Sequence, residues 1–270
     1  TDIRYAVKEM SRWMSKPRIK DWKKAVRLGK YLLQRERTIC KFDYQERTPT
    51  LEVWTDTDYA GCKDTRKSTS GGLIRIGSHV LKAWSSTQKI IALSSGEAEY
   101  YGMVKGAAEA MGTQSVLSDL ELEFKIRLFE DSSAAKGIAE RTGLGKVRHI
   151  EVNQLWIQEK VRNGQIHLVK VDGEKNLADA LTKNVDSSKL EYHMKQLRCS
   201  TDSSRHVLAP APDLLNRETG ELHGDDSDSE EQLGQLVQGT ENFINDSGTV
   251  EENELMSCTV EKKEDSKEKE

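Results

Sequence analysis

The pattern of hydrophobic and polar residues changes twice along this chain. Up to about residue 34 the apolar residues recur at helical spacing and predict two amphipathic helices, over 3–15 and 20–34. Short β-branched or aromatic runs follow, bounded by Gly, Ser and Asp as strands usually are. These runs predict strands over 51–57, 72–76, 80–84, 126–129 and 165–171.

A long helix is predicted between the third and the fourth of these strands. Over 96–119 the apolar residues form one stripe, which suits packing on a sheet. Shorter helices are predicted over 134–139, 150–162, 177–183 and 187–197. Three strands, a helix, a strand, helices, a strand and a final helix indicate an α/β layering with a mixed five-stranded sheet.

The periodic pattern ends near residue 200. From there the chain is rich in Ser, Asp, Glu and Gly and carries charge runs at 225–231 and 262–270. Such a sequence buries too little apolar surface to offset the entropy that ordering would cost. We therefore predict three parts: a helical segment over 1–45, an α/β domain over 46–199 and a disordered acidic tail over 200–270.

The net charge of −4 hides an uneven distribution. From residue 200 onward 19 acidic residues face 6 basic ones, a net charge of −13, which leaves +9 for residues 1–199. A basic body suits a polyanionic partner, because Lys and Arg that neutralise phosphates release condensed counterions. The alternative is a solvated lysine-rich surface without a nucleic-acid partner.

Cysteine usage and hydropathy limit the class of protein. The four cysteines stand singly, without a C-x-x-C pair, so neither a zinc ribbon nor a disulfide framework is expected and a reducing compartment is favoured. No apolar stretch approaches the length of a membrane span, and the N-terminus has no signal-peptide pattern. We expect a protein that is neither secreted nor membrane-spanning, and a fragment of a longer chain.

Four acidic segments carry the candidate chemistry. They are Thr55–Gly61, Ser95–Tyr100, Phe129–Ser132 and Leu177–Ala180, and each places an acid at a strand end or in a helical turn. Carboxylates that converge repel one another unless a divalent cation lies among them, and such cations prefer oxygen ligands. The segments therefore indicate metal-assisted phosphodiester chemistry.

Two of these segments offer a choice between neighbouring acids. Asp56 and Asp58 lie two apart on one strand and point to the same face, although Asp58 also suits the start of a turn. Glu97 and Glu99 lie about 200° apart on a helix, so only one of them can face the site. Ser94 and Glu97 fit a capping box, in which the Glu97 carboxylate returns to the Ser94 amide, and this leaves Glu99 for the site.

The other two acids have ordinary structural alternatives. Asp131 follows a strand and precedes a short helix, where it could be the N-cap, although Ser132 or Ser133 could cap instead. Asp179 lies on a predicted short helix, where an acid usually faces solvent.

Six ordered motifs follow one another along the chain: Thr55–Gly61, Arg66–Gly71, Trp84–Ser86, Ala92–Tyr100, Arg148–Glu151 and Leu177–Lys183. Together they resemble the ribonuclease H domain of copia-type (Pseudoviridae-like) LTR retrotransposon polyproteins. The similarity spans roughly residues 50 to 195, and residues 1–45 resemble the last helices of the reverse transcriptase that precedes this domain.

The resemblance implies a ribonuclease H-like fold and endonucleolytic hydrolysis of the RNA strand of an RNA/DNA hybrid. It implies that Asp56, Glu99, Asp131 and Asp179 hold two Mg²⁺ ions, which Mn²⁺ can replace, and that this pair activates water and stabilises the leaving oxygen. It also implies the reverse transcriptase domain of the same polyprotein as a partner, in a cytoplasmic virus-like particle or the nucleus.

Substrate contacts are predicted for small polar and basic residues near the acids, which suit phosphate and ribose. A cap or a turn is the alternative for any single serine, and a hydrogen bond that anchors its loop is the main interpretation for His149. These residues are Ser70, Ser95, Ser132, Arg148, His149 and Asn153.

One departure from related enzymes bears on activity. Cellular ribonucleases H often carry a mobile His in the loop before the last acid, but residues 172–176 here contain none. A proton shuttle at that place is therefore not expected.

The competing class of function is a catalytically inactive or co-opted ribonuclease H-like module that binds nucleic acid or a polymerase partner.

Overall fold

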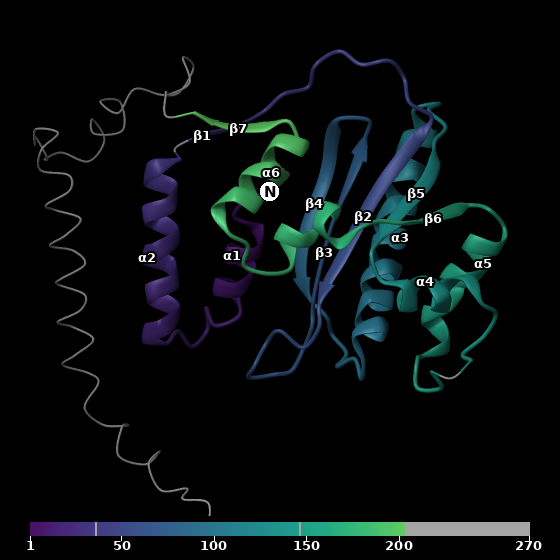
Figure 1. Cartoon of the computed structure of the whole chain (residues 1–270), viewed down its shortest axis with the longest axis horizontal. Coiled ribbons are helices and arrows are strands. Elements are labelled where there is room, and N and C mark those ends of the chain that lie inside the picture. The colour runs from purple at the N-terminus through teal and green to yellow at the C-terminus, as the bar shows by residue number, and fades with distance from the viewer. Residues whose placement is uncertain (36, 146, 203–270) are drawn as a thin grey trace, which may run out of the picture. The chain divides into compact units, whose positions relative to one another are not determined.

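A five-stranded mixed sheet organises the part of the chain that the structure describes, residues 1–35, 37–145 and 147–202 of a computed structural model (Figure 1). The strand order is β4-β3-β2-β5-β6. The first three strands pair antiparallel, whereas β5 pairs parallel with β2 and β6 parallel with β5. The strands are β2 (Thr50–Asp58), β3 (Thr69–Ile76), β4 (His79–Thr87), β5 (Lys125–Glu130) and β6 (Ile166–Lys170).

Helices cover both faces of this sheet and complete an α/β sandwich. One core packs the sheet against α3 (Ser95–Asp119), α4 (Ser133–Glu140) and α5 (Trp156–Arg162). A second core on the opposite face includes residues of the 3₁₀ turn η3 (Asp179–Leu181) and of α6 (Ser187–Gln196). Strand order and layering define the ribonuclease H-like fold, and they confirm the predicted fold class.

Alternation along β2 supplies both cores. Leu51 and Val53 face the core under α3, and Trp54 faces the other core, where it stacks on Phe129 with ring centroids 4.2 Å apart. Because successive side chains of a strand point to opposite faces, a strand buried on both sides requires apolar residues at nearly every position. This accounts for Leu51, Val53 and Trp54 in the run that predicted the strand.

Two glycines allow α3 to lie close to β2. A Cβ at Gly102 would be 2.3 Å from Thr57 Oγ1, and one at Gly106 would be 2.3 Å from Thr55 Cγ2, so any larger residue would push the helix away. The close approach brings the first turns of α3, which carry Glu99, against the end of β2.

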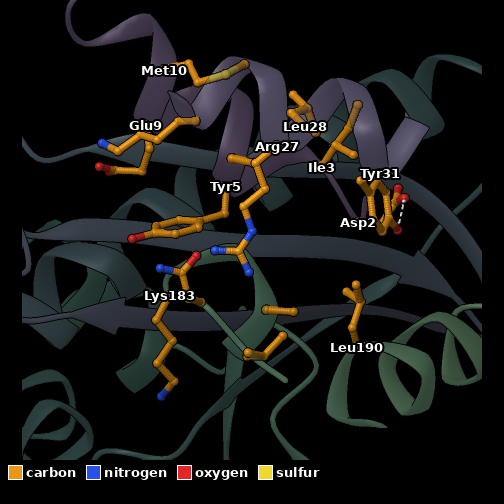
Figure 2. A pocket seen from close by; sticks show the side chains of 15 residues that line it. Asp2, Ile3, Tyr5, Glu9, Met10, Arg27, Leu28, Tyr31, Lys183 and Leu190 are labelled. Atoms are coloured by element: carbon orange, nitrogen blue, oxygen red, sulfur yellow. Dashed lines mark hydrogen bonds between the residues drawn. The ribbon is translucent and has the colours of Figure 1, made fainter. Parts of the chain in front are cut away.

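The N-terminal segment contains the two predicted helices, α1 (Arg4–Ser11) and α2 (Ile19–Gln34). A cavity of about 390 Å³ lies between these helices and residues 180–190, and Figure 2 shows its lining, with Tyr31 donating a 2.9 Å hydrogen bond to Asp2. The helices lie in the same compact unit as the sheet.

A second, two-stranded sheet was not predicted. β1 (Arg37–Cys40) pairs antiparallel with β7 (Cys199–Asp202), so the first and last strands of the described chain lie side by side (Figure 1). β7 extends the ordered structure across the boundary expected at residue 200. Most of the predicted acidic tail, residues 203–270, lies outside the described residues.

Three predicted helices are shorter than expected, and the one predicted over 3–15 ends at Ser11. The segment predicted over 150–162 divides into a 3₁₀ turn, η1 (Val152–Gln154), and α5. The segment predicted over 177–183 forms only the turn η3, and a further 3₁₀ turn, η2 (Gly173–Lys175), precedes it. Over the residues described, no helix has both the length and the apolarity that a membrane crossing needs.

Candidate active site

Carboxylates from three elements meet at one end of the sheet. Asp56 lies near the end of β2, Glu99 lies in the early turns of α3, and Asp131 directly follows β5. One carboxylate oxygen from each lies within 4.8 Å of the other two. Since β2 and β5 are adjacent parallel strands, their carboxyl ends open at the same edge, where α/β proteins commonly place their sites.

Asp56 belongs to this carboxylate group, and Asp58 does not. The Asp56 side chain is buried, and the Thr182 hydroxyl donates a hydrogen bond to its Oδ2. Burial raises the pKa of Asp56 to about 6, with the negative charge of Asp179 adding to the rise and the Thr182 hydrogen bond opposing it. Asp58 instead lies against the turn after β2, where a Cβ at Gly61 would be 1.6 Å from Asp58 Oδ2.

Glu97 makes hydrogen bonds that hold the N-terminus of α3 in place. Ser94 caps the helix by accepting a 3.2 Å hydrogen bond from the Glu97 amide, as predicted. The Glu97 carboxylate accepts from the Leu93 amide at 2.9 Å, not from the Ser94 amide as predicted, because its reach extends one residue further back. It also accepts from the Tyr101 hydroxyl at 2.9 Å and lies 2.6 Å from His149 Nε2, which confirms the anchoring role of that histidine.

Glu99 is half-buried and, unlike Glu97, has one carboxylate oxygen without a donor in the described part of the chain. Its Oε2 is sealed from solvent and has no hydrogen-bond partner among the described residues. Burial raises the pKa of Glu99 well above its ordinary value, and the charges of Glu130, Asp56 and Asp131 add to the rise. A buried oxygen without a donor, beside two further carboxylates, is the donor set that a hard divalent cation would satisfy.

Glu130 is a further buried acid beside this group, and the sequence analysis did not single it out. It is fully buried and accepts hydrogen bonds from Thr55 Oγ1 at 2.8 Å and from the Ser132 amide at 3.2 Å. Burial raises the pKa of Glu130 well above its ordinary value, with Asp131 adding to the rise. Two consecutive acids at a strand end were the available signal, because strand alternation sends the first of them under α3.

Asp131 is not needed as a helix cap. Ser132 caps α4 by accepting a 3.2 Å hydrogen bond from the Ala135 amide. Asp131 instead faces the loop at 172–176, since a Cβ at Gly173 would lie 3.1 Å from Asp131 Oδ2. This loop, which contains no histidine, therefore passes directly beside the site.

Asp179 lies close to the carboxylate group but outside it. It is only 2% exposed, so the solvent-facing alternative does not hold. Its Oδ1 pairs with Lys183 Nζ, and its Oδ2 contacts Lys189 Nζ without the geometry of a directed hydrogen bond. The structure thus brings together three of the four predicted acids and neutralises the fourth with lysines.

Two further polar residues hold η3 against the sheet. Asn176 is fully buried, donates a 2.8 Å hydrogen bond to the Thr55 carbonyl and accepts one from the Ala178 amide at 3.1 Å. The Thr182 hydroxyl, which donates to Asp56, also lies 3.0 Å from the Asp179 carbonyl oxygen. Both residues position the acids; the Leu177–Lys183 motif contains Thr182, whereas no motif of the sequence analysis contains Asn176.

The predicted substrate residues differ in exposure. Ser70 is 2% exposed and accepts a 2.8 Å hydrogen bond from Gln88 Nε2, so it belongs to the core rather than the surface. Ser132 serves as the cap of α4. Ser95, Arg148, His149 and Asn153 are exposed.

The mixed sheet and its carboxylate edge define a ribonuclease H-like module. No family model matches the chain. Over 192 residues it is 31% identical to the retrovirus-related Pol polyprotein from transposon TNT 1-94 of Nicotiana tabacum, covering 70% of this chain and 14% of that protein. Over 186 residues it is 28% identical to that from transposon RE2 of Arabidopsis thaliana, covering 67% and 13%.

The homologues of this chain are retrovirus-related Pol polyproteins from plant transposons, as the motifs predicted. The chain spans about one seventh of the length of these relatives. Among solved structures, LC11-RNase H1 isolated from compost is 17% identical, covers 54% of this chain and 99% of its own, and has a TM-score of 0.36. The fold assignment rests on the strand order and the register described above.

Proposed function

We propose that this chain hydrolyses the RNA strand of RNA/DNA hybrids with divalent cations held by Asp56, Glu99 and Asp131. The observation that carries the proposal is the buried, unpartnered Oε2 of Glu99 within a group of three carboxylates. Homology to these polyproteins supports the reaction class, because the motifs that resemble copia-type ribonuclease H contain these three acids.

The donor set suits Mg²⁺, and Mn²⁺ as its substitute. All three donors are carboxylate oxygens, which hard divalent cations prefer. Without a cation, burial raises the pKa of Asp56 and of Glu99, and the charges of the neighbouring acids add to the rise, so the ionised carboxylates are disfavoured. When bound, two such cations activate an attacking water and stabilise charge on the leaving oxygen of a phosphodiester.

The surrounding residues orient the acids before a cation arrives. Thr182 fixes one Asp56 oxygen by its hydrogen bond, and Asn176 ties the preceding turn to β2. The cap at Ser94 and the bonded Glu97 carboxylate fix the start of α3, so that Glu99 enters the site on a rigid turn. The side chains are therefore held for binding by the fold rather than by a flexible loop.

Asp179 remains in the proposal as the fourth ligand. Its carboxylate is buried and its charge raises the pKa of Asp56, so it acts on the group electrostatically. To bind a cation it must exchange its contacts with Lys183 and Lys189. Lysines that release the acid are then available to phosphate.

The hybrid would lie across the exposed residues around this edge of the sheet. Ser95, Arg148, His149 and Asn153 are accessible for phosphate and ribose contacts, and the net charge of +9 over residues 1–199 favours a polyanion. We no longer assign Ser70 a direct contact, because its hydroxyl is buried on Gln88.

A non-catalytic module is the second candidate. The pairing of Asp179 with two lysines is the observation that favours it, because an acid neutralised by lysines needs no cation. Such a module would still bind hybrid through its basic surface without cleaving it.

Cleavage of a labelled RNA/DNA hybrid by the full chain separates the two candidates. We expect 5′-phosphate and 3′-hydroxyl products with Mg²⁺ or Mn²⁺, none with EDTA, and none from duplex DNA of the same sequence. Binding of the hybrid without cleavage at millimolar cation would reject the enzyme and support the binding module.

A further inference from the structure

The two-stranded sheet of β1 and β7 places two cysteines opposite each other. Cys40 and Cys199 are 159 residues apart in the chain but are direct partners in the register. Their Sγ atoms lie 2.8 Å apart. Neither cysteine has a role in the proposed hydrolysis, and the strands that carry them were not predicted.

The position of Cys40 and Cys199 in the hydrogen-bonding pattern of the two strands brings their side chains close. The Lys41 amide donates a 3.0 Å hydrogen bond to the Arg198 carbonyl, so the adjacent Cys40–Cys199 pair is of the non-hydrogen-bonded kind. In antiparallel sheets such pairs have Cα atoms about 4.5 Å apart and their side chains nearest to each other. This spacing falls within the range that disulfides span, about 4.4–6.8 Å.

The two thiols differ in access. Cys40 is exposed, whereas Cys199 is buried, with 7% of its surface accessible. Burial, followed by the hydrogen bond with Cys40, raises the pKa of Cys199 to about 12. Because Cys40 is the exposed sulfur, it meets an oxidant first, and Cys199, whose Sγ lies beside it, resolves the product.

We propose that Cys40 and Cys199 form a site of reversible disulfide formation by exchange with a small-molecule disulfide such as glutathione disulfide. The Cys40 thiolate attacks one glutathione sulfur and releases the first glutathione as thiolate. The Cys199 thiolate then attacks the Cys40 sulfur of the mixed disulfide and releases the second glutathione. Two protein thiols are oxidised, one glutathione disulfide is reduced to two glutathiones, and the two thiol protons pass to the released thiolates.

The bond would join the two ends of the described structure. β1 directly follows α2, and β7 follows α6, so the closed loop contains the whole five-stranded sheet. Cross-linking a loop of this length restricts the unfolded chain strongly. For a unit of about 200 residues we expect the oxidised form to melt about 5–12 °C above the reduced form.

The test uses the full chain equilibrated in glutathione buffers of increasing oxidation. After free thiols are alkylated, trypsin should release a disulfide-linked pair of peptides, 38–41 joined to 199–205, since Arg37, Lys41, Arg198 and Arg205 bound them. Mass spectrometry of this pair and the melting temperature are then followed across the same buffers.

A matched set of variants assigns the effect. Cys40→Ser should remove both the linked peptides and the rise in melting temperature, while its reduced form melts close to the reduced parent. The double variant Cys62→Ser, Cys258→Ser should retain both. The proposal is overturned if the linked pair is absent in the most oxidising buffer, or if Cys40→Ser shows the same rise on oxidation as the parent.

Discussion

Glu97 and Glu99 share one helical turn of α3 and are both largely buried, yet their surroundings are opposite. Glu97 is surrounded by donors: the Leu93 amide, the Tyr101 hydroxyl and the His149 ring. Glu99 is surrounded by further acids, and its Oε2 has no donor in the described structure. A buried carboxylate with donors stabilises the fold, whereas one among acids is available for a cation.

The largest expected effect comes from changing Glu99. Glu99→Gln keeps the shape but removes a ligand charge, so hybrid cleavage should fall by several orders of magnitude. In EDTA the variant should be as stable as the parent or more so, because repulsion among the acids is relieved. Single-turnover cleavage and thermal unfolding measure the two quantities, and a strongly destabilised Glu99→Gln in EDTA would contradict the comparison.

Cation binding should stabilise the folded protein through the carboxylates around Glu99 and not through Glu97. At a concentration about 100 times its Kd, Mg²⁺ or Mn²⁺ adds about 2.7 kcal/mol to the free energy of unfolding, a rise of about 5–10 °C in melting temperature. Asp131→Asn should lose most of this rise, while Glu97→Gln should keep it. Calorimetric melting of the three proteins with and without cation makes the measurement, and an unchanged parent would remove the basis for a metal site.

The next effect in size is the dependence of stability on pH, which should arise in the carboxylate group around Glu99. Burial is the main cause that raises the pKa of Asp56 to about 6. In metal-free protein, the stability that protonated Asp56 contributes is therefore fully present below the pKa that Asp56 has in the unfolded chain. That contribution is lost as the pH rises through about 6. Between about pH 4.5 and 7.5 the parent should lose about 2 kcal/mol more unfolding free energy than Asp56→Asn.

Denaturant unfolding in EDTA at a series of pH values gives this difference. Saturating Mg²⁺ should abolish it, because the cation stabilises the ionised carboxylate. Parallel pH profiles for the parent and Asp56→Asn in EDTA would show that Asp56 does not titrate as its burial requires.

The smallest effect on cleavage is expected from losing the Glu97 hydrogen bonds. Glu97→Ala leaves the Leu93 amide and the Tyr101 hydroxyl without their partner and should cost about 1–3 kcal/mol of stability. Cleavage well below the melting range should be largely retained. Urea unfolding with a cleavage assay at low temperature tests both, and a catalytically dead but stable Glu97→Ala would place the wrong glutamate in the site.

Periodic patterns predicted most of the elements. The sheet strands and α3 were predictable because their apolar positions repeat at the period of strand or helix over several residues, as Leu51 and Val53 do. Ser94 and Glu97 gave the start of α3 through capping chemistry. The choice of Glu99 over Glu97 followed from the angle between them together with the capping box, and the structure groups Glu99 with Asp56 and Asp131.

Contacts between distant residues were not predictable in this way. β1 and β7 have four residues each, too few to show a period, and only their pairing across the fold makes them strands. The closeness of Cys40 and Cys199 follows from that pairing. Asp179 lies beside Lys189 because η3 and α6 pack together, which no local pattern encodes.

The most direct test of the central claim compares Asp131→Asn with Asp58→Asn. Both remove one carboxylate from the same end of the sheet, but only Asp131 belongs to the carboxylate group. Mn²⁺ binding by titration calorimetry and hybrid cleavage should both be lost in Asp131→Asn and retained in Asp58→Asn. Loss of both in Asp58→Asn, with Asp131→Asn behaving as the parent, would contradict the assignment of the site.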